Sequence, residues 1–247
     1  MRTNFGRSGL VRLLGQLENA SGGGSTGPDQ DLAETLSQWV GVVEAGTLHA
    51  AHQAAGALAR GSAARSSQAY GVRLEEQLRQ THAILKRAII ASGSSDTGAR
   101  SGGSRLEDFT LATEAEPDFA PYQQRYLHQQ RNMVLMISAL RNNVRKSMSA
   151  ASPELRRLAA LDAVWEQMLL VREHRLLSAL PLRLKRRFER MRKANVLSHD
   201  GPLDVEPVNW VQDFETELED VLLAELDVRL QPVTGLIEAF EQEGKNR

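Results

Sequence analysis

Cysteine is absent from this chain of 247 residues. Its absence excludes a disulfide framework, a thiolate zinc site, an iron–sulfur cluster and a cysteine nucleophile. Aromatic residues are also scarce, at 5% of the chain. Aliphatic side chains must therefore supply most of the packing in a hydrophobic core.

Long apolar runs are missing as well. The stretches that do occur are short, such as Val221–Ala224, whereas a membrane-spanning helix needs about 20 apolar residues. Arg7 and Arg12 interrupt the apolar positions near the N-terminus, and no small-residue cleavage site follows an apolar core, so we expect no signal peptide. These features predict a cytoplasmic protein without a transmembrane segment.

Motifs that bind phosphate or metal are also scarce. The glycine-rich segment 21–27 is followed by Pro28 and Asp29, whereas a phosphate-binding loop requires lysine and a hydroxyl residue after its glycines. His49 and His52 stand three residues apart, but two histidines are fewer ligands than a zinc site requires. We therefore expect no metal, no cofactor and no enzymatic activity. An enzyme whose site is assembled from scattered residues remains an alternative.

Apolar residues recur at spacings of three and four along most of the chain, which predicts amphipathic α-helices. Ser152 and Pro153 form a helix-start signal, and Pro181 indicates a break near residue 180. Strand-type alternation and Asn-Gly turns are absent. We therefore predict an all-α fold, a multi-helix bundle of long amphipathic helices. The clearest buried stripe is Tyr122, Tyr126, Gln129, Met133, Ile137, Leu140, Val144 and Met148.

The remaining helices are less sharply bounded. We expect the last long helix to be interrupted at Gln231–Pro232, with a short terminal helix after it. Asp162 and Arg172 lie near an apolar stripe, and we interpret them as paired charges that fix helix register rather than as catalytic groups. That stripe comprises Leu155, Leu158, Trp165, Leu169 and Leu176. Other helices are expected over 5–19, 31–60, 62–91, 182–195 and 209–230.

Two segments rich in glycine and serine, 21–28 and 93–104, have the composition of flexible linkers. They suggest three regions. An N-terminal helical region occupies residues 1–92, a flexible linker with an acidic segment occupies 93–117, and a C-terminal helical bundle occupies 118–247. The sequence leaves open whether the first region packs on the last. It also leaves open the oligomeric state, although long heptad-like stripes of the coiled-coil kind allow a dimer.

Charge is unevenly distributed behind a net charge of −1. Residues 121–195 contain 16 basic and 5 acidic side chains, a net of +11. Residues 196–247 contain 3 basic and 13 acidic side chains, a net of −10. Such an imbalance between neighbouring segments points to a charged interaction surface.

The basic residues are densest near the break at Pro181, where seven of them occupy eleven positions. Such a helix can neutralise nucleic-acid phosphates or meet anionic lipid. The acidic helix 209–230 carries nearly the compensating charge, so its antiparallel packing against the basic helix would pair the charges within one molecule or between subunits. We favour this pairing over an external protein partner, and both over nucleic acid or membrane. The candidate interaction surface is Arg183, Lys185, Arg186, Arg187, Arg190, Arg192 and Lys193.

Several segments resemble a family of uncharacterised proteobacterial proteins. They are the stretch 121–131, the segments around Ser152–Leu155 and Arg187–Arg190, and above all 221–233, which reads VLLAELDVRLQPV. The resemblance covers roughly residues 118–240. It implies a helical cytoplasmic protein of unknown function, often encoded near ExbB/MotA-like and OmpA-like proteins, and it brings no catalytic residues.

The leading hypothesis is therefore a non-enzymatic helical interaction or accessory protein, associated with an ion-driven envelope complex. We expect a protein partner or self-association, and no small-molecule substrate. The alternative is a nucleic-acid-binding protein that uses the basic helix 183–193.

Overall fold

The computed structural model describes residues 67–99, 117–178, 180–199 and 209–245, with a few isolated positions nearer the N-terminus. Five long helices and no strand make up the described ranges, which confirms the all-α prediction. The helices are α4 (Ser67–Ala99), α5 (Ala120–Ala151), α6 (Pro153–Ser178), α7 (Leu180–His199) and α8 (Trp210–Lys245).

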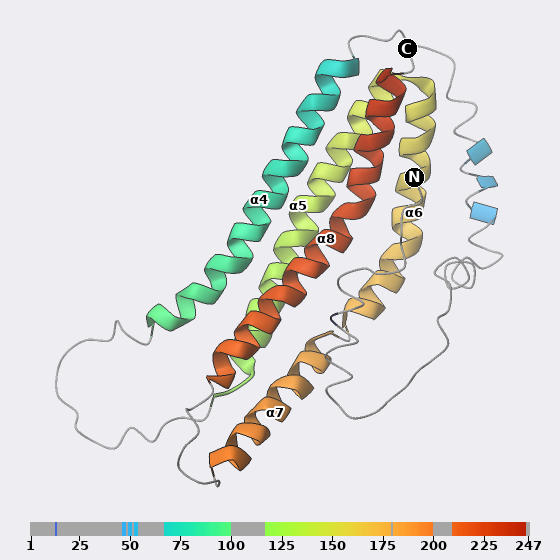
Figure 1. Cartoon of the computed structure of the whole chain (residues 1–247). Coiled ribbons are helices and arrows are strands. Elements are labelled where there is room, and N and C mark those ends of the chain that lie inside the picture. The colour runs from blue at the N-terminus through green and yellow to red at the C-terminus, as the bar shows by residue number, and fades with distance from the viewer. Residues whose placement is uncertain are drawn as a thin grey trace.

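The helices form an elongated bundle (Figure 1). Helices α4, α5 and α8 lie side by side, and α6 followed by α7 runs along the remaining flank. Helix α8 is parallel to α5 and antiparallel to α4. Gly71, near the start of α4, lies against Phe240 near the end of α8, while Tyr126 in α5 bonds Glu225 in α8.

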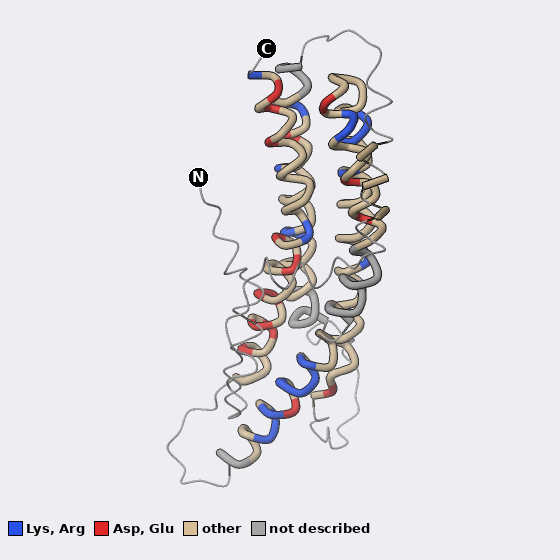
Figure 2. Tube along the Cα trace, turned by 90° about the vertical axis from the view of Figure 1, so that its right-hand side faces the viewer, with Lys and Arg blue, Asp and Glu red and all other residues tan. Residues whose placement is uncertain are grey.

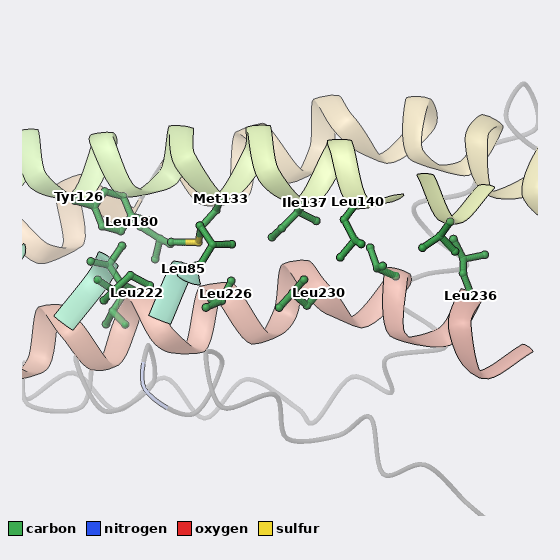
Figure 3. Packing of buried hydrophobic residues seen from close by; sticks show 14 of the residues in the cluster. Leu85, Tyr126, Met133, Ile137, Leu140, Leu180, Leu222, Leu226, Leu230 and Leu236 are labelled. Carbon is green, nitrogen blue, oxygen red and sulfur yellow. The ribbon is translucent and has the colours of Figure 1, made fainter. Parts of the chain in front are cut away.

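The core runs the length of the bundle and is lined by the stripes that helical periodicity predicts. All eight positions predicted for the α5 stripe are buried. These side chains pack with Leu85 and Ile89 of α4 and with a stripe of large aliphatic side chains on α8. Figure 3 shows part of this core between α5 and α8. Because α4 shares this core, the N-terminal region packs on the C-terminal bundle through that helix.

Helix α6 starts where serine and proline indicate. The Leu155 N–H donates to Ser152 Oγ at 3.1 Å, so Ser152 supplies the cap that the first turn requires. The described residues of α6 reach Ser178 and those of α7 begin at Leu180, next to Pro181. The predicted apolar stripe of α6 is wrong at Leu158, which is 36% exposed, while Ala159 is buried.

The predicted interruption at Pro232 is wrong, because α8 continues through it to Lys245. A proline inside a helix costs about 3 kcal/mol. Each large apolar side chain that becomes buried contributes about 1.5–3 kcal/mol. Four such side chains follow the proline on the buried stripe, so their burial outweighs its cost. They are Val233, Leu236, Ile237 and Phe240.

The predicted start of the second linker at residue 93 is also wrong, since α4 extends to Ala99. Arg125 of α5 holds this part of α4. Its Nε donates to Ser92 Oγ at 2.9 Å and its second guanidinium nitrogen donates to the Ile89 carbonyl at 3.3 Å. Arg125 comes so close to Gly93 that a Cβ there would lie 2.8 Å from the guanidinium. The rest of that linker and the linker 21–28 lie outside the described residues.

Within the described helices, none is long and apolar enough to cross a membrane. Of the N-terminal helices predicted over 5–19 and 31–60, only isolated positions are described. Those predictions therefore lie almost entirely outside the described residues.

Candidate interaction surface

Helix α7 is fixed to the bundle by an aromatic cluster at one end of the molecule. Its Phe188 is 1% exposed, and its ring centroid lies 5.1 Å from those of Trp210 and Phe214 in α8. Phe119 and Tyr122, at the start of α5, complete the cluster at 5.7 and 5.6 Å from Phe188. In a chain with so few aromatic residues, this cluster determines which side of α7 faces inward.

The inward side of α7 sets the direction of its seven basic residues. Leu180, Leu184 and Phe188 are buried, so positions half a turn away must face outward. Figure 2 shows basic positions along most of the described length of α7. They divide into a flank that meets α8 and an outer face.

Arg187 is on the α8 flank and forms the predicted charge pair. Its Nε donates to Glu217 Oε2 at 2.8 Å, and a second guanidinium nitrogen donates to Oε1. The bonds to Glu217 raise the pKa of the Arg187 guanidinium above its usual value. The antiparallel pairing of the basic and acidic helices is therefore present at this position.

Two of the other six basic residues form bonds within α7. Lys185 pairs with Glu189 of its own helix at 3.9 Å, and Arg190 Nε donates to the Arg186 carbonyl at 3.2 Å. Arg183, Arg190 and Arg192 are half-buried, whereas Lys185, Arg186 and Lys193 are exposed.

Most exposed residues of α7 lie on one stripe, which also holds the half-buried Glu189 and includes apolar side chains. Leu182 and Val196 are 53% and 54% exposed and lie on the same side of the helix as Arg186 and Lys193 by helical spacing. We call Leu182, Lys185, Arg186, Glu189, Lys193 and Val196 the outer face of α7. It is a cationic surface with an apolar residue near each end.

A second feature, the buried polar centre, lies inside the bundle and was not predicted. Glu225 of α8 is completely buried. Its carboxylate accepts hydrogen bonds from Tyr126 Oη at 2.6 Å and Gln130 Nε2 at 2.9 Å, and it pairs with Arg229 at 2.8 Å. The Glu225 carboxylate therefore has the hydrogen-bond donors and the opposite charge that a buried charge requires. This centre therefore fixes α5 and α8 in one register.

Burial and the neighbouring Glu225 charge raise the pKa of the Tyr126 phenol far above its ordinary value. An unfolded chain releases that proton above about pH 10, whereas the folded chain retains it. The Tyr126 phenol therefore makes its full contribution to the free energy of unfolding below about pH 10. Above that pH the contribution falls by up to about 1.4 kcal/mol per pH unit.

Tyr126→Phe tests this coupling. At neutral pH the variant should lose about 1–3 kcal/mol in the free energy of unfolding, and this deficit should shrink by about 1 kcal/mol between about pH 10 and 11. Urea titrations at each pH measure the difference. Tyr122→Phe is the control at neutral pH, because its hydroxyl makes a longer bond of 3.4 Å to Glu215. If the free energy of unfolding changed with pH in the same way in the wild type and in Tyr126→Phe, the raised pKa of Tyr126 would be contradicted.

A second set of ion pairs joins α5 to α6. Arg141 donates to both oxygens of Asp162, at 2.9 and 2.6 Å, and Arg145 pairs with Glu166. Asp162 is therefore a paired charge between helices, as predicted. The side chain of Arg172 lies outside the described residues.

The structure brings no three histidines or carboxylates together as a metal site among the residues it describes. His49 instead lies beside Gln53, with 2.9 Å between His49 Nε2 and Gln53 Nε2. An open depression lies at the start of α5, beside Ser92, His128 and Arg131. Ser92 Oγ donates to the Ile89 carbonyl and accepts from Arg125, so both of its hydrogen-bonding roles are occupied.

Sequence reasoning missed the buried polar centre because its members are far apart in the chain and Glu225 lies within an acidic run. One signal was available. Tyr126 stands on a mainly apolar stripe, and a phenol in such a position needs a buried partner.

Comparison with known protein families gives a match. The family described as "Protein of unknown function (DUF3348)" matches residues 1–242. Neither the curated proteins nor the solved structures contain a match. The match covers nearly the whole chain, including every described helix except the last three residues of α8. The chain therefore belongs to the DUF3348 family.

Proposed function

We propose that this protein is a non-enzymatic helical interaction protein that docks an acidic protein surface on the outer face of α7. The observation that supports the proposal is the division of α7 into two sides. Its inner side is held by the aromatic cluster and by Arg187–Glu217. Its outer face presents exposed cations together with exposed aliphatic side chains.

The composition of the outer face favours a protein partner over nucleic acid. Leu182 and Val196 offer apolar contact area, which suits an amphipathic acidic helix. A phosphate backbone gains little from such side chains, because it is recognised mainly by charge and hydrogen bonds. Glu189, which lies within the face, would also repel phosphate. A carboxylate-bearing helix can instead place an uncharged residue opposite Glu189.

We also propose that the protein acts as an accessory to an ion-driven envelope complex. This part rests on the family resemblance, which implies genes that are often encoded near those of ExbB/MotA-like and OmpA-like proteins. Co-purification with the ExbB/MotA-like protein, extracted gently from the same cells, tests it. Repeated recovery of the chain without that protein would contradict this part of the proposal.

A designed peptide tests the docking surface directly. The probe is a fluorescent helical peptide with glutamate and leucine on one face at spacings of three and four. The variant Lys185→Glu/Arg186→Glu/Lys193→Glu should bind it about tenfold or more weakly than the wild type at low salt, because like charges then oppose each other. Fluorescence anisotropy measures both affinities.

The matched control reverses three exposed cations of α4. The variant Arg73→Glu/Lys86→Glu/Arg87→Glu changes the net charge by the same amount, and all three residues are exposed. Its affinity should stay within about twofold of the wild type. Equal loss in both variants would mean that only the net charge matters, which contradicts a docking surface on α7.

Nucleic-acid binding is the second candidate, favoured by the exposed Lys185, Arg186 and Lys193. The same anisotropy assay with a duplex DNA probe separates the two. Binding of the duplex that the α7 variant abolishes, with no binding of the acidic peptide, would replace the proposed function with this one.

A further inference from the structure

The partner surface that the outer face of α7 requires is present on the same molecule, beside it. On α8, Asp213 and Asp220 are exposed and stand seven residues apart. On α7, Arg186 and Lys193 are exposed and also stand seven residues apart. None of these four side chains forms an ion pair with another residue of the described ranges. Each pair spans about 10.5 Å along its helix.

The acidic and basic stripes are in register. Arg187 bonds Glu217 where the antiparallel helices cross. Counting from that contact in opposite directions, Asp220 lies level with the helical turn that contains Arg186. Asp213 lies level with the turn that contains Lys193. An acidic stripe and a basic stripe of matched spacing therefore flank the Arg187–Glu217 contact on one side of the molecule.

We propose that this side of the molecule is the interface of a two-fold symmetric homodimer, in which the outer face of α7 in each copy docks on the acidic stripe of α8 in the other. A two-fold axis along the line between α7 and α8 places the α7 of one copy over the α8 of its partner. It keeps the two helices antiparallel and at the same level. Both stripes then meet the opposite charge, twice per dimer, as a two-fold interface requires.

The surface is large enough for a weak, reversible dimer. A helix of the length of α7, 20 residues, is about 30 Å long, and two adjacent helices are about 20 Å wide. Each copy would therefore bury about 600 Å², at the low end for specific interfaces. Charge provides most of the specificity in this arrangement, so high salt should dissociate the dimer.

A charge-swap experiment on the full chain tests the inference. Two variants are prepared, Arg186→Glu/Lys193→Glu and Asp213→Lys/Asp220→Lys. At low salt and concentrations of about 10–100 µM, sedimentation velocity should find the wild type as a dimer and each variant as a monomer. An equimolar mixture of the two variants should restore the dimer, because both reversed stripes then face an opposite charge.

The control variant Arg73→Glu/Arg87→Glu, on α4, should remain a dimer. Circular dichroism of each variant checks that it is folded, and recovery of the dimer in the mixture excludes misfolding as the cause of the monomers. A monomeric wild type, or a mixture that stays monomeric, would overturn the inference.

This inference rests on the proposed function, because it names the occupant of the same outer face of α7. The two fail differently. A monomeric wild type that still binds the acidic peptide through α7 would overturn the homodimer and leave the docking function standing. If the dimer persisted in every α7 variant and the acidic peptide did not bind, both the homodimer interface and the docking function would be overturned.

Discussion

Replacement of Arg229 by leucine is expected to lower the free energy of unfolding by about 3–5 kcal/mol. Arg229 is 12% exposed and pairs with Glu225, which is completely buried. Without the guanidinium, the Glu225 carboxylate keeps its hydrogen bonds to Tyr126 and Gln130 but loses its ion-pair partner. A buried charge that has lost its partner is among the most costly changes a core can undergo.

Urea unfolding at neutral pH measures this loss, and two further variants define its cause. Arg79→Leu removes an arginine from an ion pair with Glu76 that is 62% exposed on each side, and it should cost less than about 1 kcal/mol. Arg229→Lys retains the positive charge and should lose much less than Arg229→Leu. If the lysine and leucine variants were equally unstable, packing of the Arg229 side chain, rather than its charge, would be responsible.

Replacement of Phe188 by alanine is expected to cost about 3–5 kcal/mol. Phe188 is 1% exposed and contacts rings from both α5 and α8. Its removal leaves a cavity in the cluster that fixes α7, and the neighbouring rings cannot fill that space without moving. Because Trp210 lies 5.1 Å from Phe188, the near-ultraviolet circular dichroism should weaken along with the stability.

Leu182→Ala is the control on the same helix. Leu182 is 53% exposed, so its truncation should change the free energy of unfolding by less than about 0.5 kcal/mol. A Phe188→Ala variant as stable as the control would mean that the aromatic cluster does not hold α7 in place. The division of α7 into an inner and an outer side would then lose its basis.

The fold was largely predictable because its helices obey local rules. The stripe from Tyr122 to Met148 repeats every three or four residues without a break, so helical geometry alone places it on one face. Ser152 and Pro153 supply a start signal that depends only on neighbouring residues. Pro232 was misjudged because a local penalty was weighed without the burial of the residues after it, which depends on α4 and α5.

The site was predictable only in part, for a related reason. Charge segregation pointed to α7 and α8, and one pair, Arg187–Glu217, is present. Which basic residues face α8 depends on the rotation of α7, and the contacts of Phe188 set that rotation. Two partners of Glu225, Gln130 and Tyr126, stand 95 and 99 residues away along the chain, too far for a periodic pattern to indicate them.

The most direct test of the central claim, that α7 docks an acidic protein surface, measures four affinities. The wild type and Lys185→Glu/Arg186→Glu/Lys193→Glu are each titrated with the acidic peptide and with a version in which lysine replaces every glutamate. We predict that the wild type prefers the acidic peptide and the variant prefers the basic one, each by about tenfold. If both proteins prefer the same peptide, or neither peptide binds, the outer face of α7 is not the docking surface.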